Sequence, residues 1–120
     1  MKAVRKGNDF NLKWTIMQDA DTPLDTENIF EEHLRLICYG RKEELKTFQR
    51  EANSITLEVT PSMTPVEGIY RLEWYFKQKD LSYLKGYRNK AYDALVFKIV
   101  GQSTKDDNIR IIEIVTVLNN

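Results

Sequence analysis

The sequence predicts an all-β fold, a sandwich of roughly seven or eight antiparallel strands. Apolar and polar residues alternate in one segment after another, most clearly over residues 10–17, 54–60 and 69–78. A period of two sends successive side chains to opposite faces of a strand, so these segments are expected to be half-buried. Turn-forming residues recur about every ten positions, as in sandwiches and small barrels. The 120 residues suffice for one hydrophobic core, so we expect a single domain over residues 1–120.

The individual strands follow from this alternation and from the turn residues between them. In chain order they are expected at residues 3–6, 10–17, 33–39, 45–48, 54–60, 69–78, 92–100 and 109–118. Residues 40–44 are expected to form a charged turn. Pro61 ends the strand at residues 54–60, because proline has no N–H to donate to a neighbouring strand. An immunoglobulin-like antiparallel β-sandwich is favoured over a small barrel, but the pattern leaves the strand topology open. The Cys…Trp…Cys spacing of antibody domains is missing, since the chain has one cysteine.

An acidic connection covers residues 18–32, which contain no Lys or Arg. We expect a single helical turn through Ile29 and Phe30 at its end. The carboxylates of this segment do not match an EF-hand, because Pro23 and Leu24 stand where an oxygen ligand and a glycine are needed. A solvated loop and an irregular calcium site both remain open for this segment.

Composition excludes several classes of protein. Eighteen Lys and Arg balance eighteen Asp and Glu, so no overall field attracts nucleic acid or an anionic membrane. No apolar run approaches the roughly 20 residues of a membrane-spanning helix, and the N-terminus lacks the apolar core of a signal peptide. We therefore expect synthesis in the cytoplasm without export, and no nucleic-acid or membrane partner. Cys38 lies in phase with Leu34 and Leu36, which predicts a buried small hydrophobe.

No catalytic set can be assembled from the sequence. The one histidine, His33, cannot form a multi-histidine metal site, and no Gly-x-Ser-x-Gly elbow accompanies it. The glycines are isolated, each at an expected turn, so no phosphate-binding loop is present. The chain is therefore expected not to be an enzyme and to use no cofactor or metal.

One stretch has the character of a binding site, the twelve-residue connection expected at residues 79–90. Aromatic and cationic side chains alternate there, and such pairs bind sugars, bases or an acidic partner. The candidate binding residues are Tyr83, Lys85, Tyr87, Arg88 and Lys90. The alternative is that Leu81, Tyr83 and Leu84 fold this loop back onto the sheet. Because residues 18–32 are acidic, self-association through opposite charges is a further hypothesis.

The last expected strand departs from simple alternation, because both of its faces are apolar. Ile112, Ile114 and Leu118 lie in one phase, and Ile109, Ile111, Val115 and Val117 lie in the other. Either the acidic connection or the termini cover the second face, or another subunit does. We take Ile112, Ile114 and Leu118 as the candidate interface.

Several short segments resemble a known family. Residues 4–12, Val-Arg-Lys-Gly-Asn-Asp-Phe-Asn-Leu, are similar to the opening of immunoglobulin-like modules at the N-termini of phage baseplate and tail proteins. Similar small domains are found in proteins of gut Bacteroides and their prophages. Residues 53–57, 68–72 and 93–100 resemble the strand markers of the same family.

The resemblance implies a non-enzymatic structural module that assembles into a phage or prophage tail or baseplate particle. Its partners would be proteins or further copies of itself, and its location the virion or tail particle. The alternative is a domain that binds a carbohydrate or another surface ligand through Tyr83, Tyr87 and Arg88, with Trp74 as a weaker candidate.

Overall fold

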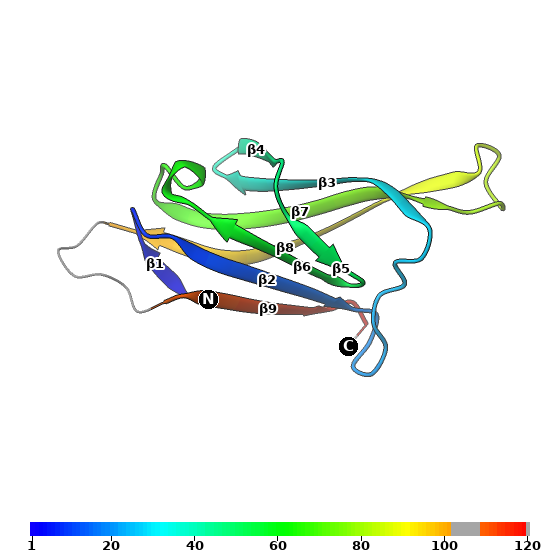
Figure 1. The fold of residues 1–120 in the computed structure, drawn as a ribbon, viewed down its shortest axis with the longest axis horizontal. Helices are drawn as coiled ribbons and strands as arrows, with labels where there is room; N and C mark the ends of the chain where they lie inside the picture. The colour runs from blue at the N-terminus through cyan, green and yellow to red at the C-terminus, as the bar shows by residue number, and fades with distance from the viewer. Residues whose placement is uncertain (102–108, 120) are drawn as a thin grey trace.

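Two β-sheets pack face to face in the computed structural model, which describes residues 1–101 and 109–119 (Figure 1). The five-stranded sheet has the order β1 (Ala3–Arg5), β8 (Tyr87–Val100), β7 (Gly68–Lys79), β3 (Ile29–Cys38) and β4 (Arg41–Leu45). The four-stranded sheet has the order β5 (Gln49–Glu51), β6 (Ser54–Val59), β2 (Phe10–Met17) and β9 (Ile111–Val117). A 3-10 turn, Pro61–Met63, follows β6. The predicted all-β sandwich is confirmed.

The sheets are mixed, so the prediction of a purely antiparallel sandwich is wrong. β1 runs parallel to β8, and β9 runs parallel to β2, while the other pairs are antiparallel. Both parallel strands are at sheet edges, and the chain crosses to the other sheet between β1 and β2 and again between β8 and β9. A parallel neighbour needs such a crossover rather than a hairpin. The alternation of side chains does not depend on strand direction, and therefore could not reveal it.

The core is built from the inward phase that the alternation predicted. In β2 the buried side chains include Leu12 and Trp14, and in β7 they include Leu72 and Trp74, all 0% exposed. Cys38, also predicted to be buried, is 3% exposed, and burial raises the pKa of its thiol. The thiol is therefore neutral at physiological pH and acts as a small apolar group.

The start of β3 corrects the prediction of a helical turn. Ile29 and Phe30 are already in β3, paired with Gln78 and Lys77 of β7. A bulge follows before His33, where Glu31 has a φ of 52°. The bulge adds residues to one strand only, which breaks the period of two and hides the strand from a search for alternation.

The charged turn predicted at residues 40–44 is also wrong. Cys38 pairs with Arg41, so only Tyr39 and Gly40 form the turn, with φ values of 49° and 79°. Two positive φ values fit a tight type I′ hairpin. The charged residues after it form β4, an edge strand, where charge prevents pairing with other chains. The strand expected at residues 45–48 is accordingly replaced by β4 and β5.

A close approach of two chain segments fixes the corner before β7. Tyr70 is 2% exposed and donates its hydroxyl to the carbonyl of Val66 at 2.6 Å. Gly68, between them, has a φ of 139°, and a Cβ atom there would come within 2.5 Å of the Tyr39 ring. Only glycine adopts this backbone conformation without strain.

Candidate functional site

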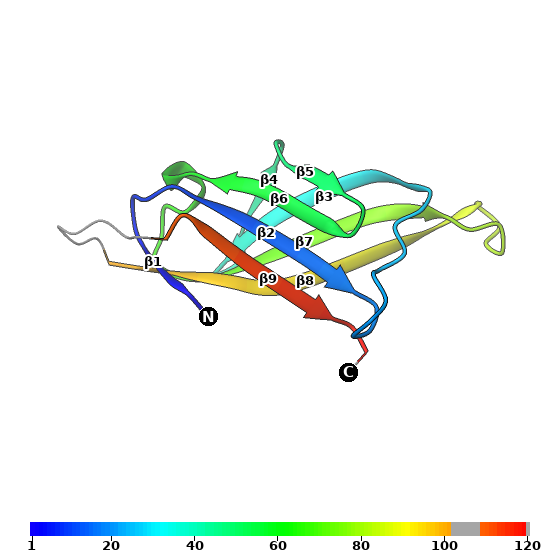
Figure 2. The ribbon, with the colours of Figure 1, turned by 60° about the horizontal axis from the view of Figure 1, so that its bottom comes forward.

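The connection predicted at residues 79–90 is shorter in the structure, because five of its twelve residues belong to strands. β7 runs to Lys79 and β8 begins at Tyr87, and these two residues still pair with each other. The loop is therefore confined to residues 80–86. Figures 1 and 2 show this hairpin projecting at one end of the long axis of a molecule measuring 56 × 29 × 21 Å. We call residues 77–90 the hairpin arm.

Hydrogen bonds within the loop hold the tip of the hairpin arm in one conformation. Asp80 donates its N–H to the Gly86 carbonyl at 2.9 Å, and Tyr83 donates its N–H to the Asp80 carbonyl at 3.2 Å. The Asp80 carboxylate accepts from the Ser82 N–H at 3.0 Å and from the Ser82 hydroxyl at 2.6 Å. These Ser82 hydrogen bonds lower the pKa of Asp80. The tip is therefore an ordered loop, held by hydrogen bonds to the Asp80 carboxylate.

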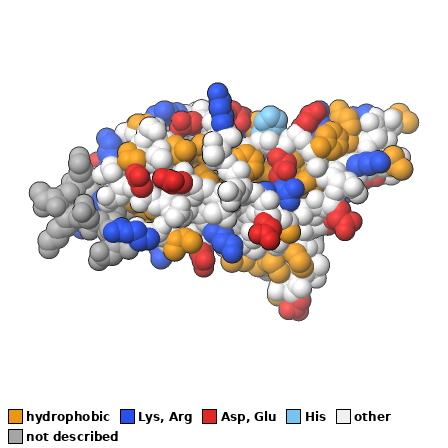
Figure 3. All heavy atoms as spheres, in the orientation of Figure 1, with side chains coloured by type: hydrophobic (Ala, Val, Ile, Leu, Met, Phe, Trp, Pro, Cys, Tyr) orange, Lys and Arg blue, Asp and Glu red, His pale blue; other side chains and the backbone are white. Residues whose placement is uncertain are grey.

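The apolar side chains of the tip point into solvent. Leu81 is 81% exposed, Leu84 is 111% exposed and Tyr83 is 45% exposed. The alternative in which these residues fold the loop back onto the sheet is therefore wrong. Figure 3 shows hydrophobic side chains together with Lys or Arg at this end of the molecule. Residues 77–90 carry five basic side chains and one acidic one, so the exposed leucines are part of a basic surface.

One aromatic ring of the hairpin arm is in contact with two lysines. The Nζ atoms of Lys77 and Lys85 lie 4.9 and 4.7 Å from the centre of the Tyr87 ring. Phe30 meets the same ring edge to face, with centroids 5.8 Å apart. Lys77 also forms an ion pair with Glu31, and a hydrogen bond from Lys77 to that carboxylate raises the lysine pKa. Two of the candidate binding residues, Lys85 and Tyr87, therefore lie in contact.

Arg88 and Lys90 do not extend this surface. Arg88 forms an ion pair with Asp80 at 3.5 Å, on the arm itself. Lys90 pairs in the sheet with Phe76, whose side chain is in the core, and Lys90 is itself half-buried. Burial is the main cause of its lowered pKa, and the charge of Arg88 adds to the effect. The predicted binding residues therefore do not form one patch: Tyr83 and Lys85 lie in the loop, Tyr87 on one face of β8, and Arg88 and Lys90 on the other face.

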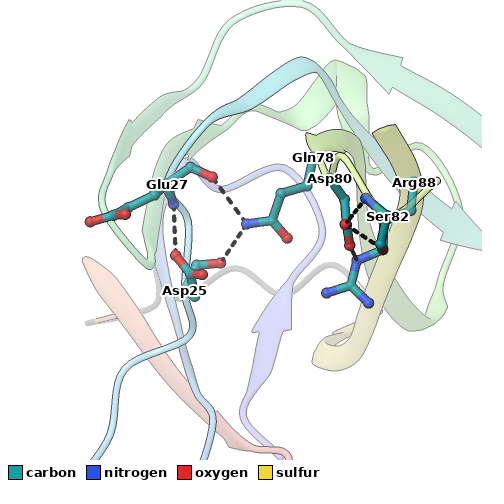
Figure 4. A network of polar contacts seen from close by, with 6 residues as sticks. All are labelled: Asp25, Glu27, Gln78, Asp80, Ser82 and Arg88. Atoms are coloured by element: carbon teal, nitrogen blue, oxygen red, sulfur yellow. Dashed lines mark hydrogen bonds and ion pairs between the residues drawn. The ribbon is translucent and has the colours of Figure 1, made fainter. Parts of the chain in front are cut away.

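The acidic connection is attached to the base of the hairpin arm. Gln78 is 6% exposed, and its side-chain N–H₂ donates to the carbonyls of Asp25 and Glu27 at 3.3 and 3.0 Å (Figure 4). The Lys79 N–H donates to the Asn28 carbonyl at 3.1 Å. The oppositely charged segments that the sequence suggested for self-association thus meet within one chain. Gln78 was not predicted as a site residue, because one amide in the inward phase of a strand carries no distinctive signal.

A shallow hollow lies on the outer face of the five-stranded sheet. Its volume is about 430 Å³, and its walls include His33, Tyr75 and Ala91. The Tyr75 ring stacks on His33 at 4.8 Å and donates its hydroxyl to Glu44 at 2.7 Å, so it leans across β3 and leaves the small Ala91 uncovered. Four of its charged wall residues are already paired, Arg35 with Glu73 at 3.0 Å and Lys77 with Glu31. The alternation placed His33 and Tyr75 outward but could not predict the lean of Tyr75.

The candidate interface on the last strand is placed differently from the prediction. Ile112 is 1% exposed and belongs to the core, Ile114 is half-buried against it, and Leu118 is 36% exposed. Within β9 itself, the exposed apolar side chains are those of the opposite phase, Ile111 at 47% and Val115 at 64%. Both phases are apolar, so the sequence could not decide which one enters the core. Ile109, which the sequence places in the same phase as Ile111 and Val115, lies just before β9 and packs against the core.

Within residues 1–101 and 109–119, no three His, Cys, Asp or Glu side chains lie together as a metal site would require. The same residues include no helix with the length and apolar character needed to cross a membrane. Comparison of the chain with protein-family models, with curated proteins and with solved structures finds no match.

Proposed function

We propose that this chain is a non-enzymatic structural module that assembles with other proteins, and that the hairpin arm is the element with which it binds a neighbour. The observation that carries the proposal is the exposure of Leu81 and Leu84 at the tip of a hydrogen-bonded hairpin. Burying both side chains against a partner removes apolar area from water, at about 25 cal/mol per Å². The ordered loop reduces the entropy lost on binding.

The charge of the hairpin arm specifies the chemistry of the partner. Lys79 precedes the loop that carries the two leucines, and Lys85 lies within that loop, directly after Leu84. A partner surface that fits this arrangement has an apolar pocket with carboxylates around its rim. Rim charges of opposite sign accelerate association and orient the partner, while the buried anchors supply most of the affinity.

The strand order supports an immunoglobulin-like version of the sandwich. Without the two parallel strands, β8-β7-β3-β4 packs against β5-β6-β2, which corresponds to strands G-F-C-C′ against D-E-B of that fold. The hydrogen bond from Tyr70 to Val66, four residues upstream, corresponds to the tyrosine corner before strand F. β9 occupies the edge beside β2 that strand A holds in that fold.

This architecture fits the family that the sequence resembles, the modules at the N-termini of phage baseplate and tail proteins. We therefore propose a phage or prophage tail or baseplate particle as the assembly. The test is to co-express the chain with the products of its adjacent genes and to isolate the complexes. A stable complex is expected with at least one of them, and the absence of any complex would contradict the proposal.

A second candidate function is glycan binding, favoured by the Tyr87 ring in contact with Lys77 and Lys85. An aromatic ring next to hydrogen-bond donors suits the apolar face of a sugar, although a sugar would have to displace a lysine from this half-buried ring. On a glycan array, wild-type binding that Tyr87→Ala abolishes would support this function. No binding, or binding unchanged in Tyr87→Ala, would remove it.

A further inference from the structure

The outer edge of β9 is a second surface suited to binding a protein. Among the strands that the structure describes, β9 pairs with β2 alone in its sheet, and Figure 1 shows it along the lower side of the molecule. At the two ends of this pair, Asn11 donates its N–H to the Arg110 carbonyl and Leu118 donates its N–H to the Met17 carbonyl, each at 2.9 Å. Because bonded residues alternate along a strand, the even-numbered residues of β9 face β2. The backbone groups directed to the free edge are those of Ile111, Glu113, Val115 and Val117.

The other strand edges described by the structure are protected in ways that β9 is not. Natural sheets guard an edge with a short strand or with charged side chains. β1 and β5 have three residues each, and β4 contains four charged residues. The part of β8 that extends beyond β1 carries Arg88, Lys90 and Asp93. β9 has seven residues and one charge, Glu113.

The side chains at this edge add an apolar surface to the unpaired backbone. Ile111 is 47% exposed and Val115 is 64% exposed, and both point away from the core. Each is β-branched, and β-branched residues pack well against a neighbouring strand. An added strand therefore gains main-chain hydrogen bonds and apolar contacts from the same residues.

We propose that the occupant of this edge is β9 of a second copy of the chain, paired antiparallel about a two-fold axis. In a register centred on Ile114, Ile111 lies opposite Val117 of the second copy, and Glu113 lies opposite Val115. The one carboxylate of each strand therefore avoids its counterpart, whereas an in-register parallel pairing would place the two side by side. The chain has a formal net charge of +0, so two copies do not repel each other. Pairing joins two four-stranded sheets into one continuous sheet.

The test compares two isoleucines of nearly equal exposure. Ile111 on β9 is 47% exposed, and Ile69, on the central strand β7, is 46% exposed. In sedimentation velocity the wild-type chain is expected to form a dimer as its concentration rises. Ile111→Lys should raise the dimer dissociation constant about tenfold or more, because a charge is then buried against an apolar strand. Ile69→Lys should change it less than about twofold.

Val115→Lys is a second variant at the same edge and should act as Ile111→Lys does, with unchanged circular dichroism showing that the fold persists. Hydrogen exchange gives an independent reading: the amides of Ile111, Glu113, Val115 and Val117 should become protected as concentration rises. A chain that stays monomeric, an equal effect of Ile69→Lys, or unprotected odd-numbered amides in the dimer would overturn the proposal. Leu81→Ser with Leu84→Ser should leave the dimer intact, which separates this interface from the hairpin arm.

Discussion

At the scale of single residues, the two tryptophans each need a partner for one indole N–H. Both side chains are 0% exposed, so neither N–H reaches water. Trp14 on β2 donates to the Thr116 hydroxyl on β9 at 2.9 Å. Trp74 on β7 donates to the Glu32 carboxylate at 3.3 Å, and the same carboxylate accepts from Arg50 on β5. These polar contacts therefore link strands that apolar packing alone would hold less specifically.

Replacing Thr116 by valine should reveal the cost of an unpaired indole. The substitution keeps the shape of the side chain but removes the acceptor for the Trp14 N–H. We expect the free energy of unfolding to fall by about 1–3 kcal/mol, measured by chemical denaturation. Thr56→Val, at an exposed position of β6, is the matched control and should change it by less than about 0.5 kcal/mol. Equal effects of the two variants would show that the Trp14 hydrogen bond contributes nothing.

At the scale of structural elements, the corner before β7 depends on one glycine. Gly68→Ala forces a side chain onto a φ of 139° and brings Cβ within 2.5 Å of the Tyr39 ring. The exposed ring can move aside, but the backbone strain remains, so the loss of stability should exceed about 1 kcal/mol. Thermal and chemical unfolding measure it. Gly101→Ala, where φ is not positive and the closest contact is 3.4 Å, should leave the free energy of unfolding nearly unchanged. An equally small effect of Gly68→Ala would contradict the inferred backbone strain.

The tip of the hairpin arm should loosen in acid. The pKa of Asp80 is lowered, mainly by its hydrogen bonds from Ser82, so the order it gives the loop is present above the ordinary value of 3.8. That order is lost as the pH falls through the lowered folded-state pKa. Amide chemical shifts and exchange rates of Ser82 and Tyr83, followed by NMR from neutral pH to about pH 2, should show the change. Asp80→Asn should show faster exchange at neutral pH, and a tip that stays ordered in this variant would contradict the role of the carboxylate.

Which elements the sequence predicts depends on whether local pattern or distant contacts decide them. The inward phase of β2 and β7 was predictable because alternation records burial directly. The outward position of Leu81 and Leu84 was not, because apolar residues in a loop suggest packing, and hydrogen bonds to Asp80 and Gly86 oppose it. β9 was predictable as a strand, but its inward phase and its parallel pairing with β2 depend on contacts between distant parts of the chain.

At the scale of the whole molecule, the two proposed interfaces lie on different elements. The hairpin arm is at one end of the long axis, and β9 runs along the body (Figure 2). A chain that pairs through β9 therefore has its arm free, and a dimer presents two arms. Two linked binding elements raise the effective affinity for a partner that displays repeated sites, as a multimeric particle does.

The most direct test of an assembly role measures the affinity of the hairpin arm for the partner isolated by co-expression. Leu81→Ser with Leu84→Ser should weaken binding about tenfold or more, measured by biolayer interferometry, because the buried anchors are lost. Ile69→Ser with Leu95→Ser, exposed apolar residues on the body of the same two strands, should change it less than about twofold. Equal binding by the arm variant and the wild type would contradict the account.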